Sequence, residues 1–488
     1  MNEDLLSGKK YARTHLGSVL ILGLGTSGKA VANYCLDLLG SRIDTLTIAA
    51  GEPNDDAHSF AAYAQERGAR VAFEVYTFEE HYDLCIASPG ISQFSRFYEN
   101  AQAASREVVS EVEFAWRESN TQSRWLAITG TNGKTTTTRL TLHILQTAGR
   151  QAQAVGNIGN TCIDAVRDNV CDIFVTEVSS FQLASTSHFA PNAAALLNIT
   201  PDHLYWHNTF DAYVQAKKKI FEQINTTSGL LVIDGTSEIS QTIINEIQHE
   251  EICAYMPIGS TAGIRELNMD ASNSYAAYLN AEACDMLTIV YKGVSYELVR
   301  ADELHIQGDH NIFNALAASA LCISHGVNIE HIRRALRTFK PLEHRLEPCG
   351  EIDGITCFND SKATNVDATL KAFEAFQTKP IFLLGGHDKG TDLTSLVQAA
   401  QNSSSAVVCF GAAASRFADA FSQGSLPYAS ADTMEHALVT ALELAHTYDA
   451  TEVVLSPACA SFDEFTSFEH RGNVFKHLVK FFAQSKQG

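Results

Sequence analysis

The segment from Trp125 to Thr136 constrains the fold of this chain more than any other. It reads Trp-Leu-Ala-Ile-Thr-Gly-Thr-Asn-Gly-Lys-Thr-Thr, an apolar strand followed by a glycine-containing loop and a helical pattern. In this arrangement backbone N–H groups and a helix N-terminus can face a phosphate group. The segment therefore predicts an α/β domain with a phosphate-binding loop.

The loop has side chains suited to a nucleoside triphosphate. In such a loop Lys134 neutralises phosphate charge and Thr135 offers its hydroxyl to Mg²⁺. The general pattern has a glycine five residues before Gly133, where this chain has Ile128, so the loop is a variant. We expect ATP to be bound by Gly130, Thr131, Asn132, Gly133, Lys134, Thr135 and Thr136.

Further strand and helix patterns flank this segment. The chain has 488 residues, and a single hydrophobic core stops growing at roughly 250 to 300 residues. A polar stretch at 118–123 and the Phe-Lys-Pro at 339–341 separate three α/β series. We therefore predict an α/β fold with three domains: a doubly wound domain at 1–120, a central P-loop-type ATPase domain with a mostly parallel sheet at 121–340, and a third α/β domain at 341–488.

Two further segments have a helical pattern, and one region has no clear pattern. The run 108–116 has a helical pattern, and so has 210–222. The region 236–285 is polar and weakly periodic, so the pattern assigns no elements there.

A second glycine-rich turn, Gly23-Leu-Gly25-Thr-Ser-Gly28, follows the first strand. A dinucleotide-binding turn normally has a carboxylate at the end of the second strand, which holds a ribose hydroxyl. Here that strand ends in Ile48-Ala-Ala-Gly51. The turn therefore suits a pyrophosphate, and it is the one feature that favours an NAD-dependent dehydrogenase.

Two polar residues follow apolar strands of the central series. Glu177 ends one strand and is a candidate Mg²⁺ ligand, and His203 follows another. Three lysines at 217–219 lie on the helix predicted for 210–222, and their spacing does not distinguish among them. A lysine near metal ions and phosphates has a lowered pKa, and its neutral amine can react with carbon dioxide to form a carbamate.

Composition excludes several classes of partner. The formal net charge is −21, whereas nucleic acid and anionic membranes bind cationic surfaces. No run reaches the roughly 18 apolar residues that a membrane helix needs, and no signal peptide is visible. The 11 cysteines are scattered without a C-x-x-C pair. We expect a cytoplasmic protein, a monomer, with reduced thiols and neither nucleic acid nor membrane as a partner.

Taken together, the motifs resemble those of the Mur ligase family. They are Gly130-Thr-Asn-Gly-Lys-Thr-Thr136, Glu177-Val-Ser-Ser-Phe-Gln182, Asn198-Ile-Thr-Pro-Asp-His203, Gly308-Asp-His-Asn-Ile-Phe-Asn314 and His344-Arg345. Three further stretches resemble the D-glutamate-adding members: Asn359-Asp-Ser-Lys-Ala-Thr-Asn365, Gly385-Gly-His-Asp-Lys-Gly390 and Leu455-Ser-Pro-Ala-Cys-Ala-Ser-Phe-Asp-Glu-Phe465. The resemblance spans nearly the whole chain. It implies a Rossmann-like N-terminal domain at 1–120 for the UDP-sugar, the central ATPase domain at 121–340, and a Rossmann-like C-terminal domain at 341–488 for the incoming amino acid.

The resemblance implies a role for individual residues. The implied catalytic residues are Lys134, Glu177, His203, Lys217 and Lys362, and the Mg²⁺ ligands are Thr135, Glu177, His203 and a carbamylated Lys217. Further ATP contacts fall on Asn311, Arg345 and Asp360. The UDP-sugar substrate is assigned to Gly25, Thr26, Ser27, Ser88, Pro89, Gly90, Asn157 and Gln182, and D-glutamate to Thr364, Lys389, Ser461 and Phe468.

The implied reaction joins D-glutamate to UDP-N-acetylmuramoyl-L-alanine through an acyl phosphate, with ATP and Mg²⁺. Two alternatives stay open: a Mur or folylpolyglutamate-type amide ligase for another amino acid, and a nucleotide-binding homologue without catalytic activity. The second alternative is suggested by Tyr205, because the family usually has Asp at this position.

Overall fold

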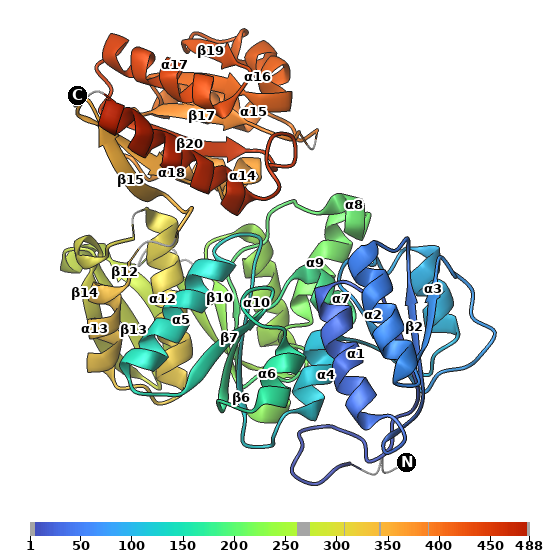
Figure 1. Ribbon diagram of the computed structural model, residues 1–488. Coiled ribbons are helices and arrows are strands. Elements are labelled where there is room, and N and C mark those ends of the chain that lie inside the picture. Colours follow the sequence, from blue (N-terminus) through green and yellow to red (C-terminus); the bar gives the residue numbers. More distant parts are fainter. Residues whose placement is uncertain (1–4, 261–273, 307, 341–342, 389, 486–488) are drawn as a thin grey trace. The chain divides into compact units, whose positions relative to one another are not determined.

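A computed structural model describes residues 5–260, 274–306, 308–340, 343–388 and 390–485 (Figure 1). The chain divides into two compact units. The first comprises Met1–Glu303 and Phe313–Arg337, and the second comprises Leu304–Ile312 and Thr338–Gly488. Within the described ranges, no helix has both the length and the apolar character needed to cross a membrane.

The first sheet of unit 1 is parallel, with the order β3-β2-β1-β4-β5. Side chains alternate between the faces of a strand, so Val19 and Ile21 pack on the side of α1, whereas Leu20 and Leu22 pack on the side of α3. The elements are β1 (Gly17–Leu22), α1 (Thr26–Leu38), β2 (Ile43–Ala50), α2 (Asp55–Glu66), β3 (Arg70–Phe73), β4 (Leu84–Ala87), α3 (Arg96–Ala103), β5 (Val108–Ser110) and α4 (Glu111–Glu118).

The central sheet, also in unit 1, has the order β14-β13-β12-β11-β10-β9-β6-β8-β7. It is parallel from β7 to β12, and β13 and β14 continue it as antiparallel strands. Its strands are β6 (Arg124–Thr129), β7 (Ala152–Gly156), β8 (Ile173–Glu177), β9 (Ala193–Leu196), β10 (Leu230–Asp234), β11 (Ala254–Ser260), β12 (Tyr275–Asn280), β13 (Met286–Tyr291) and β14 (Val294–Arg300). The helices are α5 (Lys134–Thr147), α6 (Cys162–Asp168), α7 (Ser180–Ala184), α8 (Leu204–His207), α9 (Phe210–Lys218), α10 (Glu238–Glu250), α12 (Asp309–Ser324) and α13 (Ile329–Thr338).

Unit 2 contains a six-stranded sheet with the order β15-β16-β20-β17-β18-β19, in which β15 alone of these strands is antiparallel. Apolar residues of α17 and α18 pack on one face and those of α14, α15 and α16 on the other. The elements are β15 (Glu347–Ile352), β16 (Ile355–Asn359), α14 (Val366–Glu374), β17 (Ile381–Gly385), α15 (Thr394–Ser403), β18 (Ala406–Phe410), α16 (Ala414–Phe421), β19 (Tyr428–Ala431), α17 (Met434–Thr447), β20 (Glu452–Ala458) and α18 (Phe468–Ser485).

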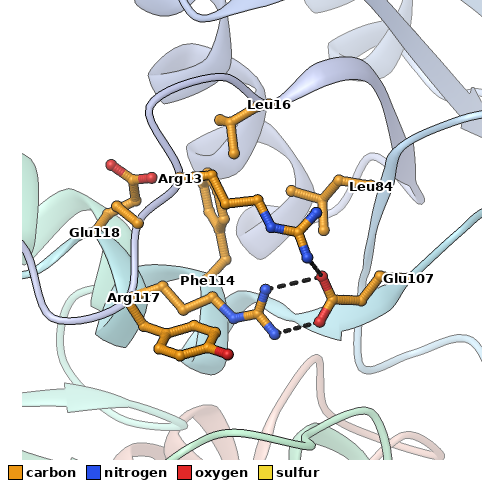
Figure 2. A pocket seen from close by; sticks show the side chains of 9 residues that line it. Arg13, Leu16, Leu84, Glu107, Phe114, Arg117 and Glu118 are labelled. Atoms are coloured by element: carbon orange, nitrogen blue, oxygen red, sulfur yellow. Dashed lines mark hydrogen bonds and ion pairs between the residues drawn. The ribbon is translucent and has the colours of Figure 1, made fainter. Parts of the chain in front are cut away.

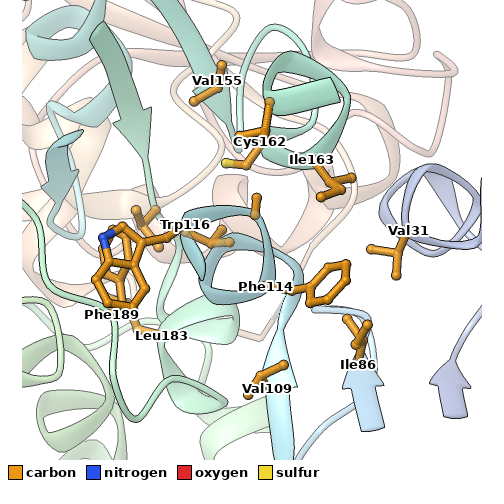
Figure 3. Close-up of a cluster of buried hydrophobic side chains, with 14 of the residues drawn as sticks. Val31, Ile86, Val109, Phe114, Trp116, Val155, Cys162, Ile163, Leu183 and Phe189 are labelled. Carbon is orange, nitrogen blue, oxygen red and sulfur yellow. The ribbon is translucent and has the colours of Figure 1, made fainter. Parts of the chain in front are cut away.

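The first and central sheets share one hydrophobic core, and α4 is its link. Figure 3 shows Phe114 of α4 beside Ile86 of β4 and Val31 of α1, and Trp116, also of α4, beside Phe189 of the central domain. Burial of apolar surface is the dominant favourable term in folding. The two sheets of unit 1 are therefore held together by a continuous core.

Buried carboxylates of α4 add polar bonds across this junction. Glu111 accepts a hydrogen bond from the backbone N–H of Ile163 at 2.7 Å, and Glu113 accepts from those of Ser187 and His188. Burial raises the pKa of the Glu111 carboxyl to about 7. Both carboxylates therefore connect the first domain to backbone amides of the central domain.

The predicted α/β class with mostly parallel sheets is confirmed, and the domain boundaries stay predictions. The helix predicted for 108–116 is wrong at its start, because Val108–Ser110 is β5, which pairs with β4. The helix predicted for 210–222 ends at Lys218. In the unassigned region, α10, β11 and β12 occupy parts of 238–280.

Candidate functional site

The phosphate loop follows β6, which lies between β8 and β9 in the central sheet. Gly133 caps α5 in the left-handed conformation, with φ +81°. A Cβ at this position would lie 2.4 Å from Asn314 Oδ1. The backbone conformation and the close packing both require glycine here.

Side chains at the end of β9 hold the loop in place. Asn198 Oδ1 accepts from the backbone N–H of Asn132 at 2.8 Å, and its Nδ2 donates to the Asn132 carbonyl at 3.1 Å. Thr131 Oγ1 accepts from the backbone N–H of Thr200 at 3.0 Å and lies 2.9 Å from the Tyr213 hydroxyl. The loop is thus shaped by bonds within the protein.

The loop residues predicted to bind ATP lie together at the start of α5. Lys134 Nζ donates to the carbonyl oxygens of Gly130 and Thr131, each at 2.8 Å. Thr135 is half-buried in the first turn of α5, and Thr136 is buried. A lysine held over the loop in this way is placed to exchange carbonyl oxygens for phosphate oxygens.

Glu177 ends β8 beside this loop and is buried. Its Oε1 accepts from Asn157 Nδ2 at 2.8 Å, whereas Oε2 has no hydrogen-bond partner among the described residues. A buried carboxylate oxygen without a partner is costly unless something else binds it. This oxygen therefore fits the predicted role of Glu177 as a Mg²⁺ ligand.

The structure distinguishes the three lysines of α9. Lys217 is buried, and its Nζ donates to the Gly130 carbonyl at 2.8 Å. Lys218 pairs with Glu246, and Lys219 donates to the carbonyl of Ala184 at 2.6 Å. Burial, and then the charge of Lys134, lower the pKa of the Lys217 amine well below its ordinary value. Lys217 is thus the lysine of the three whose amine reaches the phosphate loop.

His203 is the N-cap of α8 and has a left-handed backbone, with φ +55°. Its ring packs edge-on against Phe181, with 4.8 Å between centroids. The Tyr205 hydroxyl lies 3.5 Å from His203 Nδ1, and the Tyr205 side chain is 76% exposed. Tyr205, at the position where the family usually has Asp, thus lies close to the His203 ring.

Protein side chains alone do not form a complete metal centre. Across the described ranges, no group of three or more His, Cys, Asp or Glu residues is placed to hold a metal ion. The predicted set of Thr135, Glu177, His203 and Lys217 draws on a hydroxyl and a modified lysine as well, and Mg²⁺ commonly completes its shell with water and substrate phosphates. The unpartnered Glu177 oxygen is the observation that fits this ion.

The predicted UDP-sugar loops lie at the carboxyl ends of β1 and β4. These two strands are neighbours at the point where the strand order of the first sheet reverses, which is where such sheets bind ligands. Ser88 Oγ is buried and finds no hydrogen-bond partner in the described part of the chain. The loops hold Gly25, Thr26, Ser27, Ser88, Pro89 and Gly90.

Asn157 and Gln182 lie in the central domain. Asn157 holds Glu177, as described above, while Gln182 Oε1 accepts from the backbone N–H of Ser179 at 2.9 Å in a capping box at the start of α7. Ser92 Oγ, near the second UDP-sugar loop, donates to the Trp206 carbonyl at 2.7 Å. This bond links the first-domain loop to α8.

The other predicted residues belong to unit 2, where loops follow β16 and β20. Asp360 is buried and accepts from Ser456 Oγ at 2.7 Å, and burial raises its pKa to about 7. Lys362 Nζ lies 3.6 Å from the centroid of the Phe468 ring. Arg345 and Thr364 are half-buried, Ser461 is buried, and Asn311 belongs to the same unit. Lys389 lies outside the described residues.

The sequence reasoning missed several residues around these sites. In unit 2, Arg471 is fully buried and donates to the carbonyls of Ser361, Cys459 and Ala460, which fixes the loops after β16 and β20. In unit 1, His207 is fully buried, and burial lowers its pKa to about 4. Its spacing of four residues from His203 was the available signal, because residues at this spacing lie on one face of a helix.

A separate pocket lies at the opposite edge of the first sheet, next to the amino ends of β1 and β4. Figure 2 shows Arg13 and Arg117 both directed at Glu107, with Leu16 and Leu84 beside them. Arg13 and Arg117 each reach Glu107 at 3.0 Å. Ion pairs join Arg13 and Arg117 to Glu107 in this pocket, and it is not part of the predicted nucleotide site.

Comparisons with known proteins give matches along most of the chain. The Mur ligase middle domain matches residues 128–322, and the Mur ligase glutamate ligase domain matches residues 344–459. The UDP-N-acetylmuramoylalanine--D-glutamate ligase of Thermoanaerobacter sp. (strain X514) is 34% identical over 482 residues, which cover 97% of this chain and 98% of that protein. The chain belongs to the Mur ligase family. The protein of the same name from Alkaliphilus metalliredigens (strain QYMF) is 38% identical to this Mur ligase over 402 residues, 81% of this chain and 83% of that one.

Solved structures show the same fold as this Mur ligase. MurF from Acinetobacter baumannii superposes with a TM-score of 0.59 at 17% identity, covering 94% of this chain and 93% of that one. A pseudomurein peptide ligase type C from Methanothermus fervidus gives a TM-score of 0.55 at 15% identity, covering 96% and 100%. This agreement supports the multi-domain α/β architecture.

Proposed function

We propose that this Mur ligase is the ATP-dependent enzyme that joins D-glutamate to UDP-N-acetylmuramoyl-L-alanine in peptidoglycan precursor synthesis. The observation that carries the proposal is the convergence of the phosphate loop, the Glu177 carboxylate and the buried Lys217 amine at one edge of the central sheet. The choice of substrates is supported by relatives of that name that match along nearly the whole chain.

The proposed reaction has two steps. An oxygen of the substrate carboxylate attacks the γ-phosphorus of ATP, the bond from this phosphorus to the bridging oxygen breaks, and ADP leaves. The amine of D-glutamate then attacks the carbonyl carbon of the acyl phosphate, the C–O bond to phosphate breaks, and the nitrogen loses a proton. The first step is needed because a carboxylate is a poor electrophile until phosphate becomes its leaving group.

Residues of the central domain position the phosphates. Lys134 exchanges its two loop carbonyl oxygens for phosphate oxygens, and the amides at the start of α5 bind the remainder. Thr135, Glu177, His203 and Lys217 would hold Mg²⁺, which would supply positive charge to neutralise the phosphate groups. Lys217 joins this set as a carbamate, because a buried neutral amine can attack carbon dioxide and release a proton.

The remaining roles follow the same proposal. UDP-N-acetylmuramoyl-L-alanine binds at Gly25, Thr26, Ser27, Ser88, Pro89, Gly90, Asn157 and Gln182; ATP also contacts Asn311, Arg345 and Asp360; Lys362 assists catalysis; and D-glutamate binds at Thr364, Lys389, Ser461 and Phe468. The enzyme acts as a cytoplasmic monomer with domains at 1–120, 121–340 and 341–488.

A panel of amino acids tests the proposal. Phosphate release is measured with ATP, Mg²⁺ and UDP-N-acetylmuramoyl-L-alanine, together with D-glutamate, L-glutamate, L-alanine or meso-diaminopimelate. Of the four amino acids, we expect only D-glutamate to give phosphate release, together with an amide product of the matching mass. Release with another amino acid instead would assign a different ligase, and no release with any of them would contradict the ligase activity.

A further inference from the structure

His207 lies where three helices of the central domain meet. Its imidazole ring packs against Phe181 of α7, Trp206 of α8 and Tyr213 of α9, with centroid distances of 5.7, 4.5 and 5.2 Å. Tyr213 in turn lies beneath Lys217 Nζ, 4.8 Å from the ring centroid. The ring of His207 is therefore surrounded by helices that follow or carry the proposed magnesium ligands: α7 follows Glu177, α8 follows His203, and α9 carries Lys217.

The backbone of His207 is tied to His203. In the single turn of α8, the backbone N–H of His207 donates to the His203 carbonyl at 3.1 Å, and that of Trp206 does so at 3.0 Å. A shift of the His207 side chain would therefore move the His203 backbone as well. The left-handed backbone of His203 makes this turn specific in shape.

The side chain of His207 is tied to the strand that ends in Glu177. Its Nε2 lies 2.9 Å from Ser180 Oγ, in a hydrogen bond that is fully buried. Ser180 is the first residue of α7 and follows Glu177 by three residues. A single buried hydrogen bond thus connects the turn that begins at His203 with the segment that begins at Glu177.

The other ring nitrogen of His207, Nδ1, shows that an imidazole lowers the stability of the fold at this position. None of the residues that the structure describes forms a hydrogen bond with Nδ1, although this atom is buried. A phenyl ring would fill nearly the same space without leaving a buried polar atom unpaired. The imidazole is therefore accounted for by the bond that Nε2 makes to Ser180.

We infer that His207 is a positioning residue, which sets the separation of Glu177 and His203 through its hydrogen bond to Ser180. The inference rests on the proposed function, because it takes Glu177 and His203 as the ligands of the metal ion. Residues behind metal ligands orient them, and their loss commonly weakens metal binding by about 10- to 100-fold.

Direct metal binding tests the inference without turnover. Mn²⁺ replaces Mg²⁺ as the probe, and its free concentration is followed by electron paramagnetic resonance in the presence of a non-hydrolysable ATP analogue. We expect His207→Phe and Ser180→Ala each to weaken Mn²⁺ binding by about 10- to 100-fold. His207→Gln, whose amide can reach Ser180, restores most of the affinity. If His207→Phe fails to fold, Ser180→Ala carries the test alone.

A double variant and a matched control sharpen the result. If His207 and Ser180 act through one hydrogen bond, the double variant His207→Phe/Ser180→Ala should bind Mn²⁺ as tightly as whichever single variant has the lower Mn²⁺ affinity. His325→Phe makes the same chemical change at the end of α12 and should keep wild-type affinity.

Two outcomes separate the inference from the proposed function. Wild-type affinity in both single variants, or effects that simply add in the double variant, would overturn the positioning role. An absence of Mn²⁺ binding in the wild-type protein would overturn the metal assignment itself, and with it this inference.

Discussion

Replacing Gly133 by alanine should weaken nucleotide binding by an amount that the structure allows us to work out. The left-handed backbone at Gly133 costs an alanine about 1–2 kcal/mol. The added Cβ would also displace Asn314 Oδ1, which accepts from Thr137 Oγ1 at 3.2 Å, and losing that bond costs about 1 kcal/mol. The sum is about 2–3 kcal/mol.

This free-energy cost falls on the loop that is predicted to bind the phosphates. If the loop shifts to relieve the strain, nucleotide binding has to restore its shape, and 2–3 kcal/mol corresponds to a Kd roughly 30- to 150-fold higher. Isothermal titration with a non-hydrolysable ATP analogue and Mg²⁺ measures this change. A Gly133→Ala protein with wild-type affinity would refute the reasoning.

The same helix provides the control. Gly149 follows the other end of α5 with φ +72°, and a Cβ there would meet no described atom within 4 Å. Gly149→Ala therefore has the same backbone strain without the displaced partner and lies away from the loop. We expect a slightly lower melting temperature and an unchanged Kd. An equal loss of affinity in both variants would show that general destabilisation explains the effect.

Three further predictions concern buried charges. Lys217→Met should lower the ligation rate at least about 100-fold while leaving nucleotide affinity within about threefold, because the proposed function places the buried amine at the metal site and the methionine keeps its volume. Arg117→Met should destabilise unit 1 by about 3–5 kcal/mol in chemical unfolding, since it leaves the buried Glu113 carboxylate without its cation. The Asp360 carboxyl, with its pKa raised to about 7, binds its proton more tightly in the folded state, so the stability of unit 2 should fall as pH rises from about 4 through about 7.

Each of these has a matched control. Lys219→Met alters the same helix but removes bonds to α7 carbonyls, and it should retain much more activity than Lys217→Met. Arg70→Met breaks an exposed pair with Glu80, and it should cost less than about 1 kcal/mol. Asp360→Asn should flatten the pH dependence of melting. A Lys217→Met enzyme with normal turnover, an Arg117→Met protein as stable as Arg70→Met, or an unchanged pH slope in Asp360→Asn would contradict the respective argument.

Secondary structure is predicted best from the sequence where it depends on residues that are close together along the chain. The strand, loop and helix from Trp125 to Thr136 form as expected, because the apolar run, the glycines and the helix start are all local signals. At 108–116 the local pattern is misleading, since three residues form β5 by pairing with β4, a partner more than 20 residues away. Pairing between distant segments overrides a helical pattern there.

The candidate site shows the same division. The placement of the candidate ligands Glu177 and His203 at strand ends could be predicted, because parallel strands bring their carboxyl ends to one edge. Residue spacing alone could not choose Lys217, which the family resemblance names, over its two neighbours, since the choice depends on which face of α9 packs against the loop. The sequence also did not indicate that Glu111 and Glu113 accept hydrogen bonds at the domain junction. A helical pattern places such charged side chains in solvent, whereas here each is buried against backbone amides of another domain.

The junction at α4 has a consequence for which acceptors unit 1 can use, because it joins the two sheets of this unit. Strands β1 and β6, which precede the turn and the phosphate loop, both contribute side chains to one shared core, which sets the separation of the two strand ends. If the proposed substrate site is correct, an acceptor anchored by its diphosphate at the first position must span that gap by its own length to present its carboxylate at the second. Acceptors one residue shorter or longer would bind yet present the wrong atom, and selection would follow reach as much as chemical identity.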